Sequence, residues 1–144
     1  MIYYNFFIAY CPELENKINF HEIVSKCLRS GLENEIYYFL DKISQPETYC
    51  NEFFYNACGS GNIELIIFLL ESYPQIDFSI KIFTKLIGHT KREYVVDLVK
   101  QYYHKFDDYV TKQFVECLKK NFLEVEYLYY KDKLPEIYNL QNKL

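Results

Sequence analysis

Apolar residues recur along this chain at the spacing of amphipathic helices, and the arrangement repeats about every thirty residues. The clearest copy covers residues 53–71 and reads FFYNACGSGNIELIIFLLE. In its second half, Leu65, Phe68 and Leu69 fall on one face of a helix. Gly61 separates the two apolar segments, and glycine suits a left-handed helix end. The pattern predicts a helix, a tight turn at Gly61 and a second helix.

Three further copies keep this apolar frame while most identities change. They begin near residues 23, 83 and 114. The second helix of the last three copies opens at a glutamate, and these glutamates are 29 and 31 residues apart: Glu64, Glu93 and Glu124. In the third copy Tyr94 stands where Leu65 stands in the second. We therefore expect Tyr94 and Leu98 to be core residues.

The turn position differs among the four copies, which carry Gly31, Gly61, Thr90 and Asn121. Gly and Asn tolerate the left-handed conformation that such a turn requires, whereas Thr does not suit it. We expect left-handed turns at the two glycines and at Asn121, and a turn of a different build at Thr90.

The repeat predicts an all-α solenoid of about four helix-turn-helix units, because one helix pair cannot bury its apolar face without a neighbour. The ends of such a stack need caps. Pro135 is well placed in the first turn of a last helix. The expected division is an N-terminal cap at 1–19, repeats at 20–49, 50–79, 80–109 and 110–133, and a C-terminal cap at 134–144.

Residues 57–71, ACGSGNIELIIFLLE, resemble the second half of an ankyrin repeat, which commonly reads A-A-x-x-G-H-L-E-V-V-K-L-L-L-E. The four copies cover about residues 20–131 and share the apolar frame more than the identities. The T-P-L-H signature is absent, the period is about 30 instead of about 33, and the alanines are mostly replaced. We expect shortened or missing hairpin loops and helices held apart by larger side chains.

This chain is rich in Tyr, Asn and Ile and only partly keeps the ankyrin pattern. In both respects it resembles the ankyrin-like proteins of giant DNA viruses of amoebae. Some amoebae themselves encode similar chains. The resemblance implies a cytoplasmic protein, located in the host cytoplasm if it is viral. It also implies a protein–protein interaction module without catalytic activity or cofactor, which binds a protein partner through the repeat surface.

Charge and cysteine content narrow the classes of function. The net charge is −4 and the pI about 5.4, so no net basic field favours nucleic acid as partner. The five cysteines form no C-x-x-C pair and no Cys/His cluster with metal-ligand spacing, which suits reduced thiols without a metal. The apolar segment 1–10 lacks a basic start, so we expect it to pack on the first helices, and no membrane span is expected.

A catalytic centre is not predicted. His21, His89 and His104 are far apart and have no H-x-x-x-H spacing. The segment Gly59-Ser60-Gly61 follows a helix and lacks the lysine of a phosphate-binding loop, so the repeat turn explains it. We expect no enzyme activity.

Partner-binding candidates are the loop and first-helix residues that the core pattern does not use. They are Gln45, Glu47, Tyr49, Asn51, Gln75, Asp77, Phe78, His104, Phe106 and Asp107. Exposed aromatic rings provide contact area at low entropic cost. The alternative for the three aromatic candidates is that they fill gaps between repeats.

Two other functions remain open beside a monomeric binding module. The first is a structural protein that assembles with itself through an uncapped repeat end. The second follows from residues 134–137, LPEI, which resemble the start of an F-box, the motif of an adaptor for a ubiquitin ligase. Only seven residues follow, so a capping helix is preferred.

Overall fold

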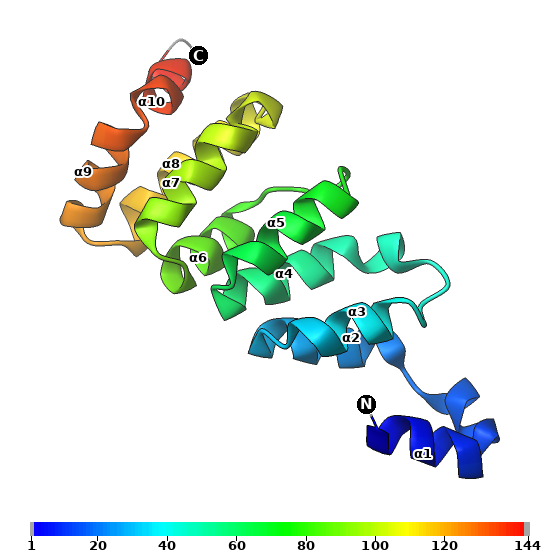
Figure 1. Cartoon of the computed structure of the whole chain (residues 1–144). Coiled ribbons are helices and arrows are strands. Elements are labelled where there is room, and N and C mark those ends of the chain that lie inside the picture. The colour runs from blue at the N-terminus through cyan, green and yellow to red at the C-terminus, as the bar shows by residue number, and fades with distance from the viewer. Residues whose placement is uncertain (1, 143–144) are drawn as a thin grey trace.

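The computed structural model describes residues 2–142 as a row of packed helices (Figure 1). Met1 and residues 143–144, which belong to the predicted caps, lie outside the described residues. The α-helices are α1 (Ile2–Tyr10), α2 (Phe20–Ser30), α3 (Glu33–Leu40), α4 (Cys50–Ser60), α5 (Ile63–Ser72), α6 (Ile80–His89), α7 (Arg92–Tyr102), α8 (Asp108–Asn121), α9 (Glu124–Lys133) and α10 (Pro135–Asn142). Short 3₁₀ helices are η1 (Pro12–Lys17), η2 (Pro46–Tyr49) and η3 (Tyr103–Lys105). The described chain contains no strand, which confirms the all-α prediction.

The middle of the chain forms four helix pairs that follow one another in space as they do in sequence (Figure 1). Within each pair a tight turn leads from the first helix to the second. The first helices form the closest packing, because α2 lies against α4, α4 against α6, and α6 against α8. At the C-terminal end α10 packs against α8 and α9. We call α2, α4, α6 and α8 the first helices, and α3, α5, α7 and α9 the second helices.

Polar side chains fix where several helices begin. The Asn62 side chain accepts hydrogen bonds from the backbone N–H groups of Glu64 and Leu65 at the start of α5. Ser79 caps α6 and Asp107 caps α8 in the same way. Each cap satisfies a backbone donor that has no partner inside the helix.

The four turns between paired helices are of two kinds. After α2 and α4 the chain turns through Gly31 (φ 71°) and Gly61 (φ 70°), and these are the positive φ values among the described residues. After α6 it turns through extended Thr90, and after α8 through extended Phe122. The expectation of a left-handed Asn121 is therefore wrong, because Asn121 is the last residue of α8 and the turn is made by the residue after it.

The core runs through the whole row and is rich in aromatic rings. Phe83 of α6 is fully buried, and the centroid of its ring lies 5.1 Å from that of Phe114 on α8. Phe54 of α4 contacts Phe78, which in turn stacks on Phe83. This chain of rings joins three consecutive helix pairs.

Tyr94 departs from the predicted core. It is 44% exposed, whereas Leu65, its counterpart in the preceding pair, is fully buried. The buried face of α7 is formed by other residues, including Leu98. The turn before α7 lacks a left-handed glycine, so the α6–α7 pair does not reproduce the geometry of α4–α5. Tyr94 instead borders a shallow groove together with Ile63 and Ile67.

The second helices are joined by polar contacts between neighbouring pairs. Asn62 at the start of α5 donates to Glu33 Oε1 of α3 (3.2 Å). Arg92 Nη1 of α7 lies 3.2 Å from Glu126 Oε1 of α9, and its guanidinium lies 4.3 Å from the centroid of the Tyr129 ring. These contacts bridge the wider spacing between second helices.

Both ends of the row are covered. In α1, Tyr4 packs edge-on against Phe20 and Phe39, and its hydroxyl donates to Glu15 Oε1 (3.1 Å). At the other end, Leu134 and Ile137 are buried where α10 meets α8 and α9. The apolar residues around the LPEI segment are therefore used for packing within this chain.

All five cysteines are free thiols, and their burial predicts the order in which an alkylating reagent modifies them. Cys58 and Cys117 are fully buried, and burial raises the pKa of both thiols. The reactive thiolate is therefore scarce at these two sites even at mildly alkaline pH. We expect iodoacetamide to modify the partly exposed Cys11 in the folded protein, and Cys58 and Cys117 only after denaturation. Peptide mass spectrometry measures this order, and equal native labelling of Cys11 and Cys58 contradicts it.

Candidate functional site: a basic groove on the first helices

The loop residues expected to bind a partner lie at several separate places. Gln45, Glu47, Gln75 and His104 are exposed in the connections between pairs. Tyr49 stacks its ring on His21 of α2, with centroids 4.2 Å apart and planes at 4°. The structure does not gather these side chains into one surface.

Phe78 and Phe106 lie together inside the row. Their ring centroids are 5.0 Å apart, and each ring also contacts Phe83 at 5.7 Å. Both rings are half-buried and belong to the packed chain of aromatics that joins the pairs. They therefore fill space between neighbouring pairs.

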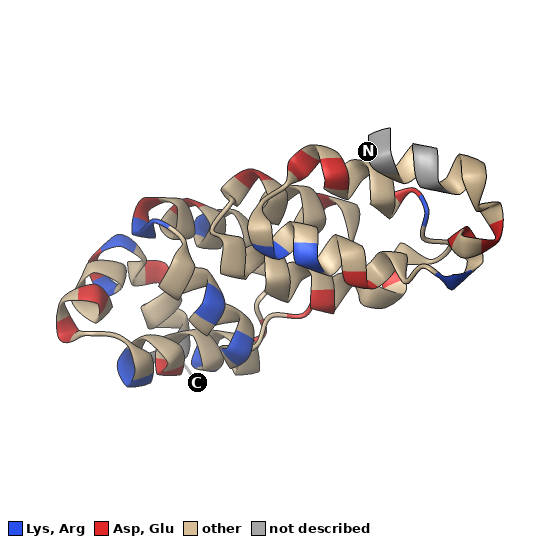
Figure 2. Ribbon diagram, turned by 90° about the horizontal axis from the view of Figure 1, so that it is seen from below, with Lys and Arg blue, Asp and Glu red and all other residues tan. Residues whose placement is uncertain are grey.

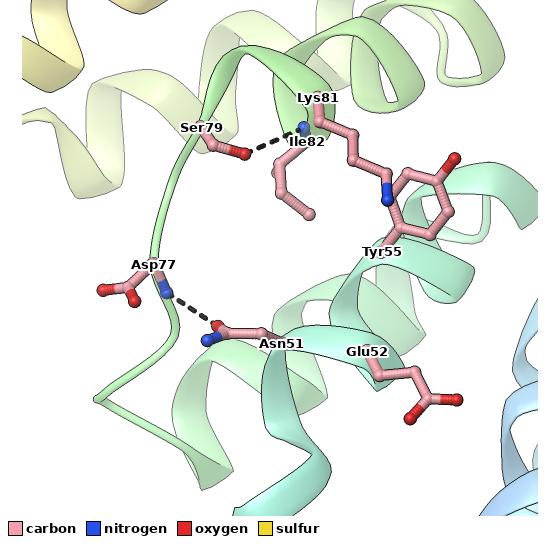
Figure 3. A pocket seen from close by; sticks show the side chains of 7 residues that line it. All are labelled: Asn51, Glu52, Tyr55, Asp77, Ser79, Lys81 and Ile82. Carbon is pink, nitrogen blue, oxygen red and sulfur yellow. Dashed lines mark hydrogen bonds between the residues drawn. The ribbon is translucent and has the colours of Figure 1, made fainter.

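The remaining candidates meet around the loop before α6. The Asn51 side chain accepts a hydrogen bond from the Asp77 backbone N–H (2.9 Å), which ties the start of α4 to that loop (Figure 3). Asp77 also borders a second hollow, of about 190 Å³, which reaches Asp107 at the start of α8. Asp107 accepts from the Val110 backbone N–H (2.7 Å) as the cap of α8.

Two hollows lie side by side on the first helices and share Tyr55 of α4 as a common wall. One, of about 360 Å³, lies between α4 and the start of α6 (Figure 3). Its lining is Asn51, Glu52, Tyr55, Asp77, Ser79, Lys81 and Ile82. The other, of about 410 Å³, reaches α2 and is lined by Arg29, Tyr55, Asn56, Gly59, Lys85 and His89. We call the two together the basic groove.

Two lysines of α6 converge on the Tyr55 ring. Lys81 Nζ lies 4.3 Å from the ring centroid, and Lys85 Nζ lies 5.4 Å from it. Figure 3 shows the Lys81 ammonium group beside the Tyr55 ring. The face of an aromatic ring attracts cations, so Tyr55 orients both ammonium groups. Their spacing of four residues on one helix also places them on the same face.

Arg29 of α2 is held in place by a polar chain that runs to α4. Its Nε donates to Asn56 Oδ1 (3.1 Å), while Asn56 Nδ2 donates to the backbone carbonyl of Glu52 (2.9 Å). Ser25 of α2 donates to Glu52 Oε1 (3.1 Å). Because Asn56 is buried and uses both ends of its amide, the position of the guanidinium is fixed at one edge.

The cations of the basic groove have no acidic partner in ion-pair range within the described part of the chain. The ion pairs there involve other lysines and Arg92, and they lie mostly along single helices or between second helices. Arg29, Lys81 and Lys85 therefore keep their charge available to an anion from outside.

Charge is divided between the two rows of helices. The first helices carry seven Lys and Arg against four Asp and Glu, a net charge of +3. The second helices carry four Lys and Arg against nine Asp and Glu, a net charge of −5. Figure 2 shows that both kinds of charge extend along the row. A chain that is acidic as a whole thus presents a basic row.

Sequence reasoning missed the basic groove because its cations come from α2 and α6, far apart in the chain. One signal was present: residues 80–89, IKIFTKLIGH, contain two lysines and a histidine without an acid. Nothing in the sequence shows that Arg29 lies against the same hollow, since this depends on how closely the first helices stack.

No family model, curated protein or solved structure matches this chain. Among the described residues no helix is both long enough and apolar enough to cross a membrane, and no three His, Cys, Asp or Glu side chains gather as metal ligands. The interpretation of the site therefore rests on its own geometry.

Proposed function

We propose that this chain is a non-catalytic protein-binding module, a solenoid of ankyrin-like helix pairs that holds its partner on the outward face of the first helices. The observation that carries the proposal is the basic groove, where Lys81 and Lys85 of α6 lie against the Tyr55 ring and Arg29 of α2 lines the same hollow, all three without an ion-pair partner among the described residues. Such hollows across neighbouring pairs are the usual binding surfaces of stacked repeats.

The ankyrin-like assignment is supported by the segment that resembles the family. Residues 57–71 form the end of α4, the left-handed turn at Gly61 and most of α5. The succession of helix pairs in Figure 1 is the arrangement expected when each unit contacts only its neighbours.

The nature of the groove supports binding more than catalysis. It contains three permanent cations and a tyrosine, and its serine, Ser79, is engaged as the cap of α6. Burial raises the pKa of Cys58 and Cys117, which makes these thiols poor nucleophiles. Preformed, outward-facing cations are instead suited to electrostatic recognition of another surface.

Affinity capture with matched variants tests the proposed function. The tagged protein, a Lys81→Ala/Lys85→Ala variant and a Lys100→Ala control are recovered from the cells that express them, and bound proteins are identified by mass spectrometry. Lys100 is an exposed lysine of α7 on the opposite row. We expect a specific partner with the wild type and the control, depleted at least about tenfold with the groove variant. Identical protein profiles for all three contradict the proposal.

Self-association is the second candidate function, and the surface of α9 favours it. Leu123, just before α9, and Val125 and Leu128 within it are 77%, 68% and 52% exposed, which leaves exposed apolar side chains near one end of the row. Exposed apolar side chains that gather on a surface often mark contacts with another protein. Light scattering over a range of concentrations separates the candidates: a constant monomer mass supports partner binding, and a mass that rises with concentration supports assembly.

A further inference from the structure

We propose that the partner segment held in the basic groove is an acidic stretch of polypeptide, whose carboxylates bind between Arg29 of α2 and Lys85 of α6. The inference rests on the proposed function, because it names the chemistry of the partner at the same groove. Charge complementarity carries the argument.

Two lysine ammonium groups beside one ring repel each other, and among the described residues no carboxylate lies within ion-pair range of either. Repulsion between like charges falls when an anion lies between them. The Tyr55 ring attracts both ammonium groups and so restricts the Lys81 and Lys85 side chains, which reduces the side-chain entropy lost when a carboxylate binds. The free protein is therefore already arranged for an anion.

Arg29 adds a directional contact from the opposite wall. Its Nε is engaged by Asn56, while its terminal nitrogens make no hydrogen bond within the described part of the chain. A guanidinium fixed at one edge presents the paired N–H groups that match a carboxylate. His89 lines the same hollow, and this half of the groove contains no acidic side chain.

The two halves of the groove differ in charge, so the bound segment has a preferred direction. The half near α2 holds Arg29, Lys85 and His89. The half near the start of α6 holds Lys81 together with Glu52 and Asp77. Carboxylates bind in the first half, while the second half accepts a neutral stretch of the same peptide, since Glu52 and Asp77 repel further acids there.

An acidic peptide fits this groove better than a nucleic acid. A polyanionic strand needs a strongly basic extended surface, whereas the first helices carry a net charge of only +3 and the chain as a whole −4. Base stacking on Tyr55 would also have to displace lysine ammonium groups that already lie close to the ring. A short acidic peptide is attracted by the cations of the groove and does not extend to the acidic second helices, which would repel it.

Fluorescence anisotropy with a synthetic peptide tests the inference. The probe is a short labelled peptide of alternating glutamate and alanine followed by a neutral stretch, and its control carries glutamine for glutamate. We expect the glutamate peptide to bind more weakly as salt concentration rises. Lys85→Ala and Arg29→Ala each lower its affinity about tenfold, as for the loss of one charged hydrogen bond. Lys100→Ala, with the same change in net charge, leaves the affinity within about twofold.

A further variant separates fixed geometry from net charge. Arg29→Lys keeps the positive charge and loses the planar fork, so we expect a loss of affinity between those of the wild type and Arg29→Ala. Circular dichroism of each variant verifies that the helices are intact.

Three outcomes overturn the inference: equal binding of the glutamine peptide, equal effects of Lys100→Ala and Lys85→Ala, or displacement of the probe by single-stranded RNA at lower concentration than by unlabelled peptide. These outcomes are distinct from failure of the proposed function. Suppose that affinity capture from cells yields a partner that the groove variant loses, while the glutamate peptide does not bind. The proposed binding function is then supported, and the inference that the bound segment is acidic is wrong.

Discussion

Gly61→Ala is expected to lower the free energy of unfolding by about 3 kcal/mol, more than the same substitution at Gly31. Gly61 has φ 70°, a conformation that costs a residue with a side chain ~1–2 kcal/mol. A Cβ atom there would also collide with the backbone carbonyl oxygen of His89, far inside van der Waals contact. The rest of the loss comes from the shift of the α6–α7 turn that this clash requires.

Gly31→Ala is the matched control for this prediction. Gly31 has almost the same φ, 71°, but the nearest atom to its added Cβ is Asn62 Nδ2 at 3.8 Å, an ordinary contact. Gly31→Ala therefore loses only about 1 kcal/mol of stability, the cost of placing alanine at a positive φ. Thermal denaturation followed by circular dichroism compares the two, with an expected fall of roughly 10 °C for Gly61→Ala and roughly 4 °C for Gly31→Ala. Equal losses contradict the close approach of Gly61 to the next pair.

Phe83→Ala is expected to cost about 4 kcal/mol, because it removes a fully buried ring from the centre of the aromatic chain. The ring contacts Phe78, Phe106 and Phe114, with centroid distances of 5.7, 5.7 and 5.1 Å. A stack in which each pair contacts only its neighbours depends on such interfaces for cooperativity. The variant is therefore expected to unfold in two steps, where the wild type unfolds in one.

Urea denaturation and hydrogen exchange measure this effect. We expect amides of α8 and α9 to exchange faster in Phe83→Ala than those of α2 and α4, since the coupling between the halves is weakened. Tyr109→Ala is the control: its side chain is 66% exposed, and the change is expected within about 0.5 kcal/mol. A single transition with an unchanged midpoint for Phe83→Ala shows that the ring is not central to the core.

The sequence permitted the helices to be predicted because their signals are local. Apolar spacing marks α5, and Gly31 and Gly61 mark two turns where only a glycine fits easily. The turns after α6 and α8 were less predictable, because Thr90 and Phe122 leave the helix in extended conformation, which most residues adopt. Tyr94 is exposed although its counterpart Leu65 is buried. Equivalent positions of the repeat can therefore differ in burial when the preceding turn differs.

The candidate site was less accessible to sequence reasoning than the fold. Loop aromatics such as Phe78 and Phe106 resemble exposed anchors in the sequence, but their rings pack against Phe83 between pairs. The cations of the basic groove, Arg29 and Lys85, lie in different repeats and meet only because the first helices stack closely. Local patterns reveal helix faces, whereas a groove between helices depends on tertiary geometry.

The division of charge between the two rows gives the molecule an electric dipole moment across its thickness. Packed helices are separated by about 10 Å, which is comparable with the Debye length of about 8 Å at physiological ionic strength. A partner approaching to within this distance experiences the nearer row more strongly than the farther one, so an acidic segment is attracted on one side and repelled on the other. This difference in force rotates the protein so that its first helices face such a segment before contact. Added salt shortens the range of the force, so the rate of productive encounters falls as the salt concentration rises.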